Sequence, residues 1–367
     1  MRLVSIDNAK NGMVIARNIF TSDGNILLGK GKALTEDYIF RLEQWNINSL
    51  YIEDEIIGEI EIDELVNEQT KVETIRITKE AMNNIRNGKM MNSEKVRKAV
   101  NNIMEELIQN RKVIVNLVDI RAMNDFTFGH SVEVCILSLL TGIDLGYNFP
   151  KLKQLGYGAL LHDVGKSTVS ETLLYKKTEL TPEERKEIEK HARLGYEILQ
   201  KQEEISSVSA HVAWQHHERY DGSGYPRGIK GAEIQEFARV VALADAFDAM
   251  TTDRVYREKK VMPHEALEYL RDTGGTLFDP EIVKVFIQNI APFPTGSIVS
   301  LNTGEKAVVT KVSKDFPSRP EIRIIQNSDG QRLTEPMEKD LRKELTVFIV
   351  GVLDEIEAGK LLSIEGN

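Results

Sequence analysis

The sequence contains a single cysteine, Cys135, among 367 residues. One cysteine permits no intrachain disulfide, and such sparse use of cysteine is typical of proteins that fold in a reducing compartment. No run of apolar residues approaches the ~20 that a membrane-spanning helix needs, and the first residues do not have the layout of a secretory signal peptide. We therefore expect a cytoplasmic protein without a membrane span.

The chain also lacks an excess of positive charge, since 57 Asp and Glu outnumber 47 Lys and Arg and the net charge is −10. This balance argues against a partner that is a nucleic-acid polymer or an anionic membrane. A small nucleotide substrate is compatible with it, because metal ions and a few local cations can recruit such an anion. The hydrophobic (41%) and charged (28%) contents are ordinary for a globular protein. The length predicts two or three domains.

The stretch 216–257 concentrates the residue types that carry chemistry, HHERYDGSGYPRGIKGAEIQEFARVVALADAFDAMTTDRVYR. Within it, 237–250 is a nearly all-apolar helical run that is interrupted by Asp245 and Asp248. The two aspartates are three positions apart and therefore share one face of the helix. A buried carboxylate is costly unless a metal ion or a cation compensates it. For Asp245 alone, an ion pair with arginine explains the pattern equally well.

The histidines of the chain favour a metal ion over an arginine ion pair as the partner of Asp245. Each histidine alone is more often an ordinary core or surface residue than a ligand. Together with Asp163 and Asp245, however, the chain supplies five imidazoles and no thiolate, from His130, His162, His191, His216 and His217. This set is too large for one ion and suits a two-metal site in which one carboxylate bridges.

Three motifs in this order resemble the HD-GYP domain, a branch of the HD phosphohydrolases: His162-Asp163-Val164-Gly165-Lys166, HHERYDGSGYPRG and ADAFDAMTTDRVYR. The resemblance covers roughly residues 121–290. Members of this family hydrolyse the bacterial second messenger cyclic di-GMP, and some act on related cyclic dinucleotides. The resemblance implies a signalling hydrolase that converts cyclic di-GMP to linear pGpG, or further to GMP. Two alternatives stay open: a non-catalytic cyclic dinucleotide receptor, and a phosphodiesterase that prefers a mixed cyclic dinucleotide.

The resemblance also implies a ligand set for two divalent ions, iron or manganese, that share and activate a hydroxide. The implied ligands of one ion are His130, His162, Asp163 and Asp245, and those of the other are His191, His216, His217 and a bridging Asp163.

A second set of residues is implied to act on the substrate. Lys166 lies one turn beyond Asp163, where its ammonium can reach a phosphate or leaving oxygen, so both are expected to be catalytic. A lysine in isolation would be assigned to the surface. The glycine-rich segment 221–228 lines the dinucleotide pocket in the family, and arginines suit phosphate or guanine contacts. The implied substrate contacts are Lys166, Tyr225, Pro226, Asp248, Arg254 and Arg257.

The flanking patterns predict an α+β multidomain protein in which an all-α HD-type helical bundle lies between a small α/β module and a small β domain. The expected segments are an α/β module (1–56), a helical connector (57–120), the catalytic domain (121–291), a β domain (292–353) and a tail (354–367). Helices are expected near 95–110, 130–146, 150–163, 181–201, 205–217, 235–250, 262–272 and 279–290. Strands are expected at 13–20, 26–28, 49–52, 297–301, 307–312, 321–325 and 346–350. An apolar stripe along 96–107 belongs either to the core or to the seam of a homodimer.

Phe126 leads to a prediction of the number of metal ions. In three-metal members of the family, a glutamate stands one helical turn before the first histidine, and here that position holds Phe126, which cannot ligate. Asp125 is adjacent, but neighbouring helical positions point about 100° apart. We predict close to two metal ions per chain, and a higher count after Phe126→Glu. Elemental analysis of protein freed of loosely bound metal measures this number, and a reproducible value near three in the unmodified chain would contradict it.

Overall fold

The computed structural model describes residues 1–21, 25–45, 47, 49–54, 57–58, 60, 64–116, 126–174, 176, 178–252 and 261–362. The chain divides into two compact units. The helical unit comprises Leu65–Arg111 and Asp125–Asn289, and the flanking unit comprises Met1–Glu64, Lys112–Asn124 and Ile290–Asn367.

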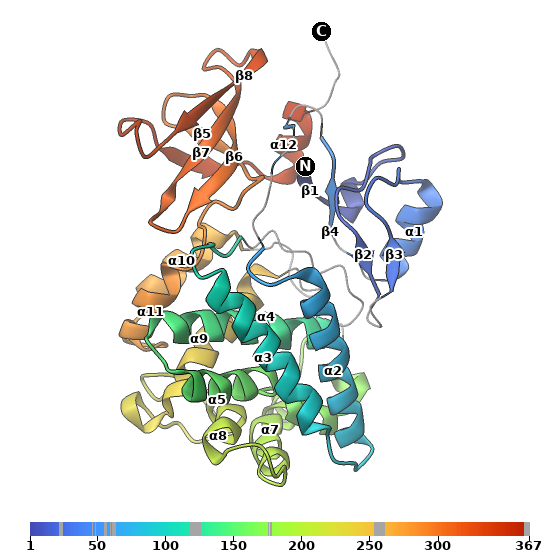
Figure 1. The fold of residues 1–367 in the computed structure, drawn as a ribbon, viewed down its shortest axis with the longest axis vertical. Coiled ribbons are helices and arrows are strands. Elements are labelled where there is room, and N and C mark those ends of the chain that lie inside the picture. Colours follow the sequence, from blue (N-terminus) through green and yellow to red (C-terminus); the bar gives the residue numbers. More distant parts are fainter. Residues whose placement is uncertain are drawn as a thin grey trace. The chain divides into compact units, whose positions relative to one another are not determined.

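The helical unit is built from helices of four to nineteen residues (Figure 1). They are α2 (Glu68–Arg86), α3 (Ser93–Gln109), α4 (Phe126–Asp144), α5 (Phe149–Leu160), α6 (Glu171–Leu174), α7 (Pro182–Leu199), α8 (Ser207–Gln215), α9 (Glu236–Thr251), α10 (Pro263–Asp272) and α11 (Pro280–Ile287), with the 3-10 helices η2 (Val164–Thr168) and η3 (Gly231–Glu233). Each helix expected from the sequence is present, its ends displaced by no more than about one turn. The start of α7 shows why: the Thr181 hydroxyl accepts from Glu184 N–H, the Glu184 carboxylate accepts from Thr181 N–H, and Pro182 occupies the first turn.

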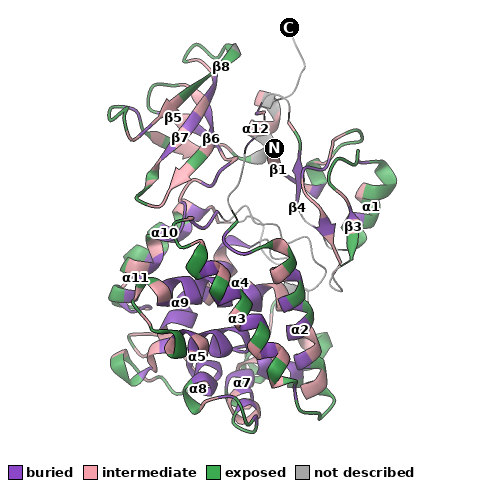
Figure 2. Cartoon of the chain, in the orientation of Figure 1, coloured by how far each residue is buried: buried purple, intermediate pink, exposed green. Residues whose placement is uncertain are grey.

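Helix α9 lies at the centre of this unit and packs against α4, α5, α8, α10 and α11. Its residues are buried over most of its length, whereas α2 and α3 carry exposed residues along one side (Figure 2). A helix that is apolar all round is stable only when it is enclosed by other helices. Polar groups on α9 are therefore placed in the interior of the unit.

Helices α2 and α3, expected as part of a connector, are part of the helical unit. Both pack against α4, and α3 also packs against α5. The apolar stripe of α3, including Val100, Ile103 and Leu107, is fully buried within the single chain, so the stripe belongs to the core rather than to a dimer seam. Arg86 at the end of α2 donates from Nε to the Ser167 carbonyl at 3.4 Å.

The flanking unit combines two small strand pairs with a larger sheet. Its elements are β1 (Arg2–Ser5), the 3-10 helix η1 (Ile6–Asn8), β2 (Ile19–Phe20), β3 (Ile26–Leu28), α1 (Glu36–Gln44), β4 (Ser49–Ile52), β5 (Ile298–Leu301), β6 (Lys306–Ser313), β7 (Phe316–Gln326), β8 (Arg332–Asp340), β9 (Ile349–Val352) and α12 (Glu355–Leu362). Strands β1 and β4 pair, β2 and β3 pair, and the five C-terminal strands form an antiparallel sheet in the order β8-β7-β6-β5-β9. Alternate residues such as Val299, Val309 and Ile322 form its buried face.

The flanking unit differs in detail from the expectation. The expected strand 13–20 is shortened to β2, with Val14 and Ile15 in isolated bridges. The last expected strand is displaced to β9. Strands β1 and β8 are absent from the expectation. None of the described helices combines the length and the apolar character required to cross a bilayer.

Candidate metal centre

Several connections and helices of the helical unit bring the seven expected ligands together. His130 is on α4, His191 on α7 and Asp245 on α9; His162 and Asp163 lie between α5 and η2, and His216 and His217 directly follow α8. The ligand atoms fall into two groups, each with its atoms within 4.8 Å of one another: Asp163, His191, His216 and His217, and His130, His162 and Asp245.

Asp163 lies at the meeting point of the two groups. Its Oδ1 is 3.5 Å from His191 Nε2 and 3.7 Å from His216 Nε2, while its Oδ2 is 3.4 Å from His162 Nε2. The two carboxylate oxygens therefore face different groups, which is the geometry that a bridging carboxylate requires.

Backbone carbonyls fix the orientation of three of the rings. The Nδ1 atoms of these histidines lie 2.6 to 3.1 Å from carbonyl oxygens: Ala159 for His162, Ile188 for His191, and Val212 and Ala213 for His216. A neutral imidazole that donates from Nδ1 presents the lone pair of Nε2. The Nε2 atoms of all three rings therefore point toward Asp163 as ligands rather than as donors. This orientation by carbonyls was not foreseen from the sequence.

Electrostatics keeps the group around Asp163 in the protonation states that bind cations. Burial lowers the pKa of His191 to about 3, and burial also lowers the pKa values of His216 and His217. Burial acts to raise the pKa of Asp163, but the Lys166 ammonium and His162 outweigh it, so this pKa lies well below its usual range. Neutral imidazoles beside an ionised carboxylate are the protonation states that metal binding requires.

Unsatisfied buried atoms show that the cluster fits a metal ion. Among the described residues, His162 Nε2 and Asp163 Oδ1 are buried without a hydrogen-bond partner. His191 Nε2 lies 3.2 Å from His217 Nε2 and 3.5 Å from His216 Nε2, so ring nitrogens converge on one point. Lone pairs that converge in a buried site repel one another unless a proton or a cation lies between them. A donor set of imidazole nitrogens and carboxylate oxygens suits divalent transition metals.

Asp248, implied by the resemblance to contact the substrate, is completely buried, and its Oδ2 lies 2.5 Å from His130 Nδ1. Asp245, one turn earlier on α9, places Oδ1 3.1 Å from the other ring nitrogen, Nε2. Burial acts to lower the pKa of His130, but the carboxylates of Asp248 and Asp245 raise it to about 9. The same negative field attracts a metal cation to Nε2, as carboxylate–histidine pairs do in metal sites.

Lys166 extends from η2 back to the cluster, with Nζ 2.5 Å from Asp163 Oδ2. About a quarter of its side chain is exposed, whereas Asp163 is only 1% exposed. Gly165 allows η2 to approach α7 closely, since a Cβ at this position would lie 1.9 Å from the His191 carbonyl oxygen. The ammonium is thus both the partner of Asp163 and the group that reaches toward solvent.

The glycine-rich loop is fastened to the ligand segment beside it. Tyr225 N–H donates to the His217 carbonyl at 3.2 Å, and its ring stacks on the His217 ring with centroids 4.6 Å apart. Arg227 N–H donates to Glu218 Oε1 at 2.9 Å. A Cβ on Gly224 would lie 2.4 Å from the His217 carbonyl oxygen, so only glycine permits this approach.

Three residues considered from the sequence have no structural account. Asp125, Arg254 and Arg257 lie outside the described residues. Pro226 is exposed and follows Tyr225 in the loop. The spacing of Asp245 and Asp248 could have indicated this contact with His130, because two carboxylates on one face of a buried helix can lie on either side of one imidazole.

Two family models match consecutive parts of the chain. Residues 112–282 match a family model described as an HD domain, and residues 298–361 match a model described as a KOW domain associated with the HD domain. A cyclic di-GMP phosphodiesterase of Pseudomonas aeruginosa is 30% identical over 225 residues, which cover 61% of this chain and 54% of the relative. A cyclic di-GMP phosphodiesterase of Thermotoga maritima is 37% identical over 163 residues, 44% of each chain.

A third relative has a different named substrate. The 3'3'-cGAMP-specific phosphodiesterase 1 of Vibrio cholerae is 35% identical over 187 residues, which cover 51% of this chain and 42% of the relative. The chain thus spans about half the length of the curated relatives it matches.

The contacts of Asp248 predict that Asp248→Asn weakens metal binding. The amide keeps the size of the side chain but removes the charge that supports His130, and loss of such a partner typically costs about 10- to 100-fold in metal affinity. Metal content after dialysis against a graded series of chelator concentrations measures the effect, with Asp272→Asn, at the exposed last residue of α10, as the control. Unchanged metal affinity together with weaker substrate binding would show that Asp248 acts on the substrate rather than on metal binding.

Proposed function

We propose that residues 112–282 belong to the HD-GYP branch of the HD domain family, and that the protein is a metal-dependent phosphodiesterase that hydrolyses cyclic di-GMP. The observation that carries the proposal is the convergence of five imidazoles and two carboxylates in two adjoining groups. A receptor that only binds the dinucleotide has no need for this complete ligand set.

We assign two divalent ions to the cluster. His130, His162, Asp245 and Asp163 would hold one, and His191, His216, His217 and Asp163 the other. When bound, the ions would supply Lewis-acid activation of water and of the phosphodiester. Iron and manganese are the proposed metals.

The protein's own groups would position the substrate and stabilise charge. Lys166 is the one lysine whose ammonium contacts a ligand carboxylate in the described part of the centre, and its partial exposure leaves it accessible to a phosphate oxygen. A fixed cation at this place would stabilise the negative charge that develops as the phosphodiester bond breaks. Tyr225, held over His217, would contact the nucleotide from the loop, next to Pro226. Arg254 and Arg257 remain proposed contacts to phosphate or guanine.

We also propose that the catalytic domain comprises the whole helical unit. Helices α2 and α3 contribute to its core, and Arg86 of α2 reaches the backbone beside Lys166. The N-terminal α/β module and the C-terminal KOW-type domain then flank the catalytic domain in sequence.

The proposed activity predicts that the metal-loaded protein linearises cyclic di-GMP by attack of water at phosphorus. Protein purified without oxygen would be reconstituted in turn with iron, manganese and other divalent ions, and products separated by chromatography would be scored as pGpG or GMP. A parallel reaction with 3'3'-cGAMP tests the preference for a mixed dinucleotide. Stoichiometric binding of dinucleotide without turnover under every metal would exclude the enzyme and support the receptor.

Lys166→Ala is predicted to retain the metal ions and to slow turnover by about a hundredfold or more, since one donor to the developing charge is lost. Single-turnover kinetics and metal analysis of the same preparation measure the two effects. Lys190→Ala, an exposed lysine on α7, is the matched control. Unchanged turnover would assign Lys166 to the surface, and loss of metal would restrict its role to holding Asp163.

A further inference from the structure

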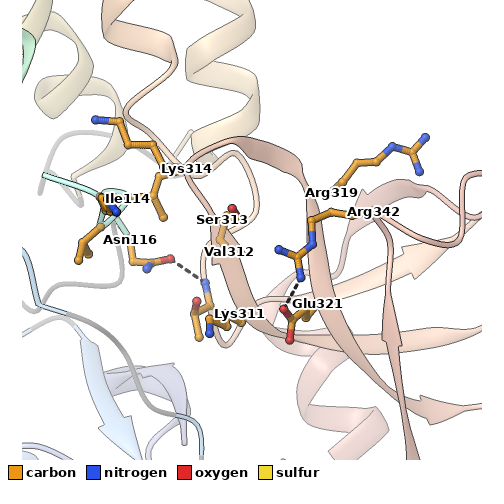
Figure 3. A pocket seen from close by; sticks show the side chains of 12 residues that line it. Ile114, Asn116, Lys311, Val312, Ser313, Lys314, Arg319, Glu321 and Arg342 are labelled. Atoms are coloured by element: carbon orange, nitrogen blue, oxygen red, sulfur yellow. Dashed lines mark hydrogen bonds and ion pairs between the residues drawn. The ribbon is translucent and has the colours of Figure 1, made fainter. Parts of the chain in front are cut away.

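The flanking unit contains a cavity of about 450 Å³ that shares no residue with the metal centre. Its walls come from the segment 112–116, from the facing ends of β6 and β7, and from the turn after β8 (Figure 3). The segment is fastened in place, because Ala291 N–H donates to the Val115 carbonyl and Thr295 N–H donates to Asn116 Oδ1, both at 3.0 Å. The cavity is therefore part of the fold of this unit.

Five basic side chains line the cavity, and only one carboxylate, Glu321, does. Glu321 is already engaged, since its Oε1 lies 2.6 Å from Arg342 Nη2 (Figure 3). Asp340 also pairs with Arg342, at 2.8 Å from Nε. The charge of Arg342 is thus compensated, because both Glu321 and Asp340 are paired with it.

Arg319, Lys112 and Lys311 are not neutralised in the same way by the carboxylates that the structure describes. Arg319 donates from its guanidinium to the carbonyl oxygens of Leu341, Val347 and Leu345 and forms no ion pair with a described carboxylate. The side chains of Lys112 and Lys311 are exposed, and their ammonium groups form neither a hydrogen bond nor an ion pair with any residue that the structure describes. Positive charge is therefore concentrated at this cavity, although the chain as a whole carries a net charge of −10.

Neutral donors lie beside these cations. Asn116 is nearly buried and uses its Oδ1 as an acceptor for Thr295 N–H, so its Nδ2 is left to donate. The hydroxyls of Thr295 and Ser313 also line the cavity. Amide and hydroxyl donors next to lysine and arginine are the groups that bind phosphate oxygens.

We propose that this cavity binds a small ligand that carries two or more phosphoryl groups, at a site separate from the metal centre. The volume is within the range of small-molecule sites, which is about 300–1,000 Å³. The lining lacks aromatic side chains, so recognition rests on the phosphates rather than on stacking of a base.

The observations favour a small anion over a nucleic-acid polymer. A polymer extends beyond the cavity and meets the negative charge of the rest of the chain, whereas a short polyphosphate meets only the local cations. Electrostatic attraction of this kind acts within about 10 Å at 0.1 M salt. The site therefore favours a small ligand whose phosphate groups lie close together.

Calorimetric titration of the full chain with inorganic pyrophosphate and with GDP tests the proposal. The test variant is Lys112→Ala/Lys311→Ala, in which two exposed side chains are shortened without disturbing the core. The matched control is Lys30→Ala/Lys32→Ala, which removes two exposed lysines of the same unit and changes the net charge equally. Asp163→Ala provides a second control, because a probe that binds at the metal centre loses its site there.

The expected result is binding of both probes that weakens about tenfold or more in Lys112→Ala/Lys311→Ala, as loss of charge-assisted contacts implies. Both control variants should retain the affinity of the unmodified chain. Absence of binding, equal affinity in Lys112→Ala/Lys311→Ala, or loss of binding in Asp163→Ala would each overturn the proposal. A single-stranded RNA oligonucleotide that binds more tightly than pyrophosphate, through the same lysines, would replace the small ligand with a polymer.

Discussion

The buried carboxylate of Asp163 places the strongest constraint on this structure. An ionised group that is almost completely removed from water requires compensating charge and hydrogen bonds within a few ångströms. Lys166 supplies one full charge, and the imidazoles of the adjacent His162 and of two other parts of the chain, His191 and His216, surround the two oxygens. Helices α5, α7 and α8 must therefore converge, and their approach is fixed by short polar distances as well as by apolar packing. Chemistry and folding depend on the same few contacts.

Helix α9 extends this constraint to the other half of the centre. Its two aspartates contact opposite nitrogens of one ring, so His130 on α4 cannot rotate without losing a partner. The loop that carries Tyr225 is hydrogen-bonded to the backbone of the proposed ligand His217. A ligand residue and a proposed substrate contact thus share one local structure, and a displacement of either would move the other.

The sequence was most informative where the pattern is local. Helix periodicity, caps such as Thr181 and the order of the histidine motifs predicted the helices and indicated which residues to consider together. Strand β8 was missed because its residues, Arg332–Asp340, are mostly polar and include Pro336, as an edge strand allows. The apolar stripe of α3 indicated a buried face but could not show which surface covers it, so the core and a dimer seam both remained possible from the sequence. The contact of Asp248 with His130 was not predictable for a similar reason, since spacing fixes the face of Asp248 on α9 but its partner comes from α4.

The packing of α3 determines where a fragment that retains the centre can begin. The HD domain match begins at residue 112, after α3 has ended, yet the apolar face of α3 lies against α4 and α5. The fit is close: a Cβ on Gly156 of α5 would lie 2.5 Å from Val100 Cγ1 of α3. A fragment cut at the family boundary would leave this surface uncovered, and exposed apolar patches of that kind promote aggregation. The shortest soluble piece that retains the centre should therefore start before α2, near Leu65, even though no metal ligand occurs until His130.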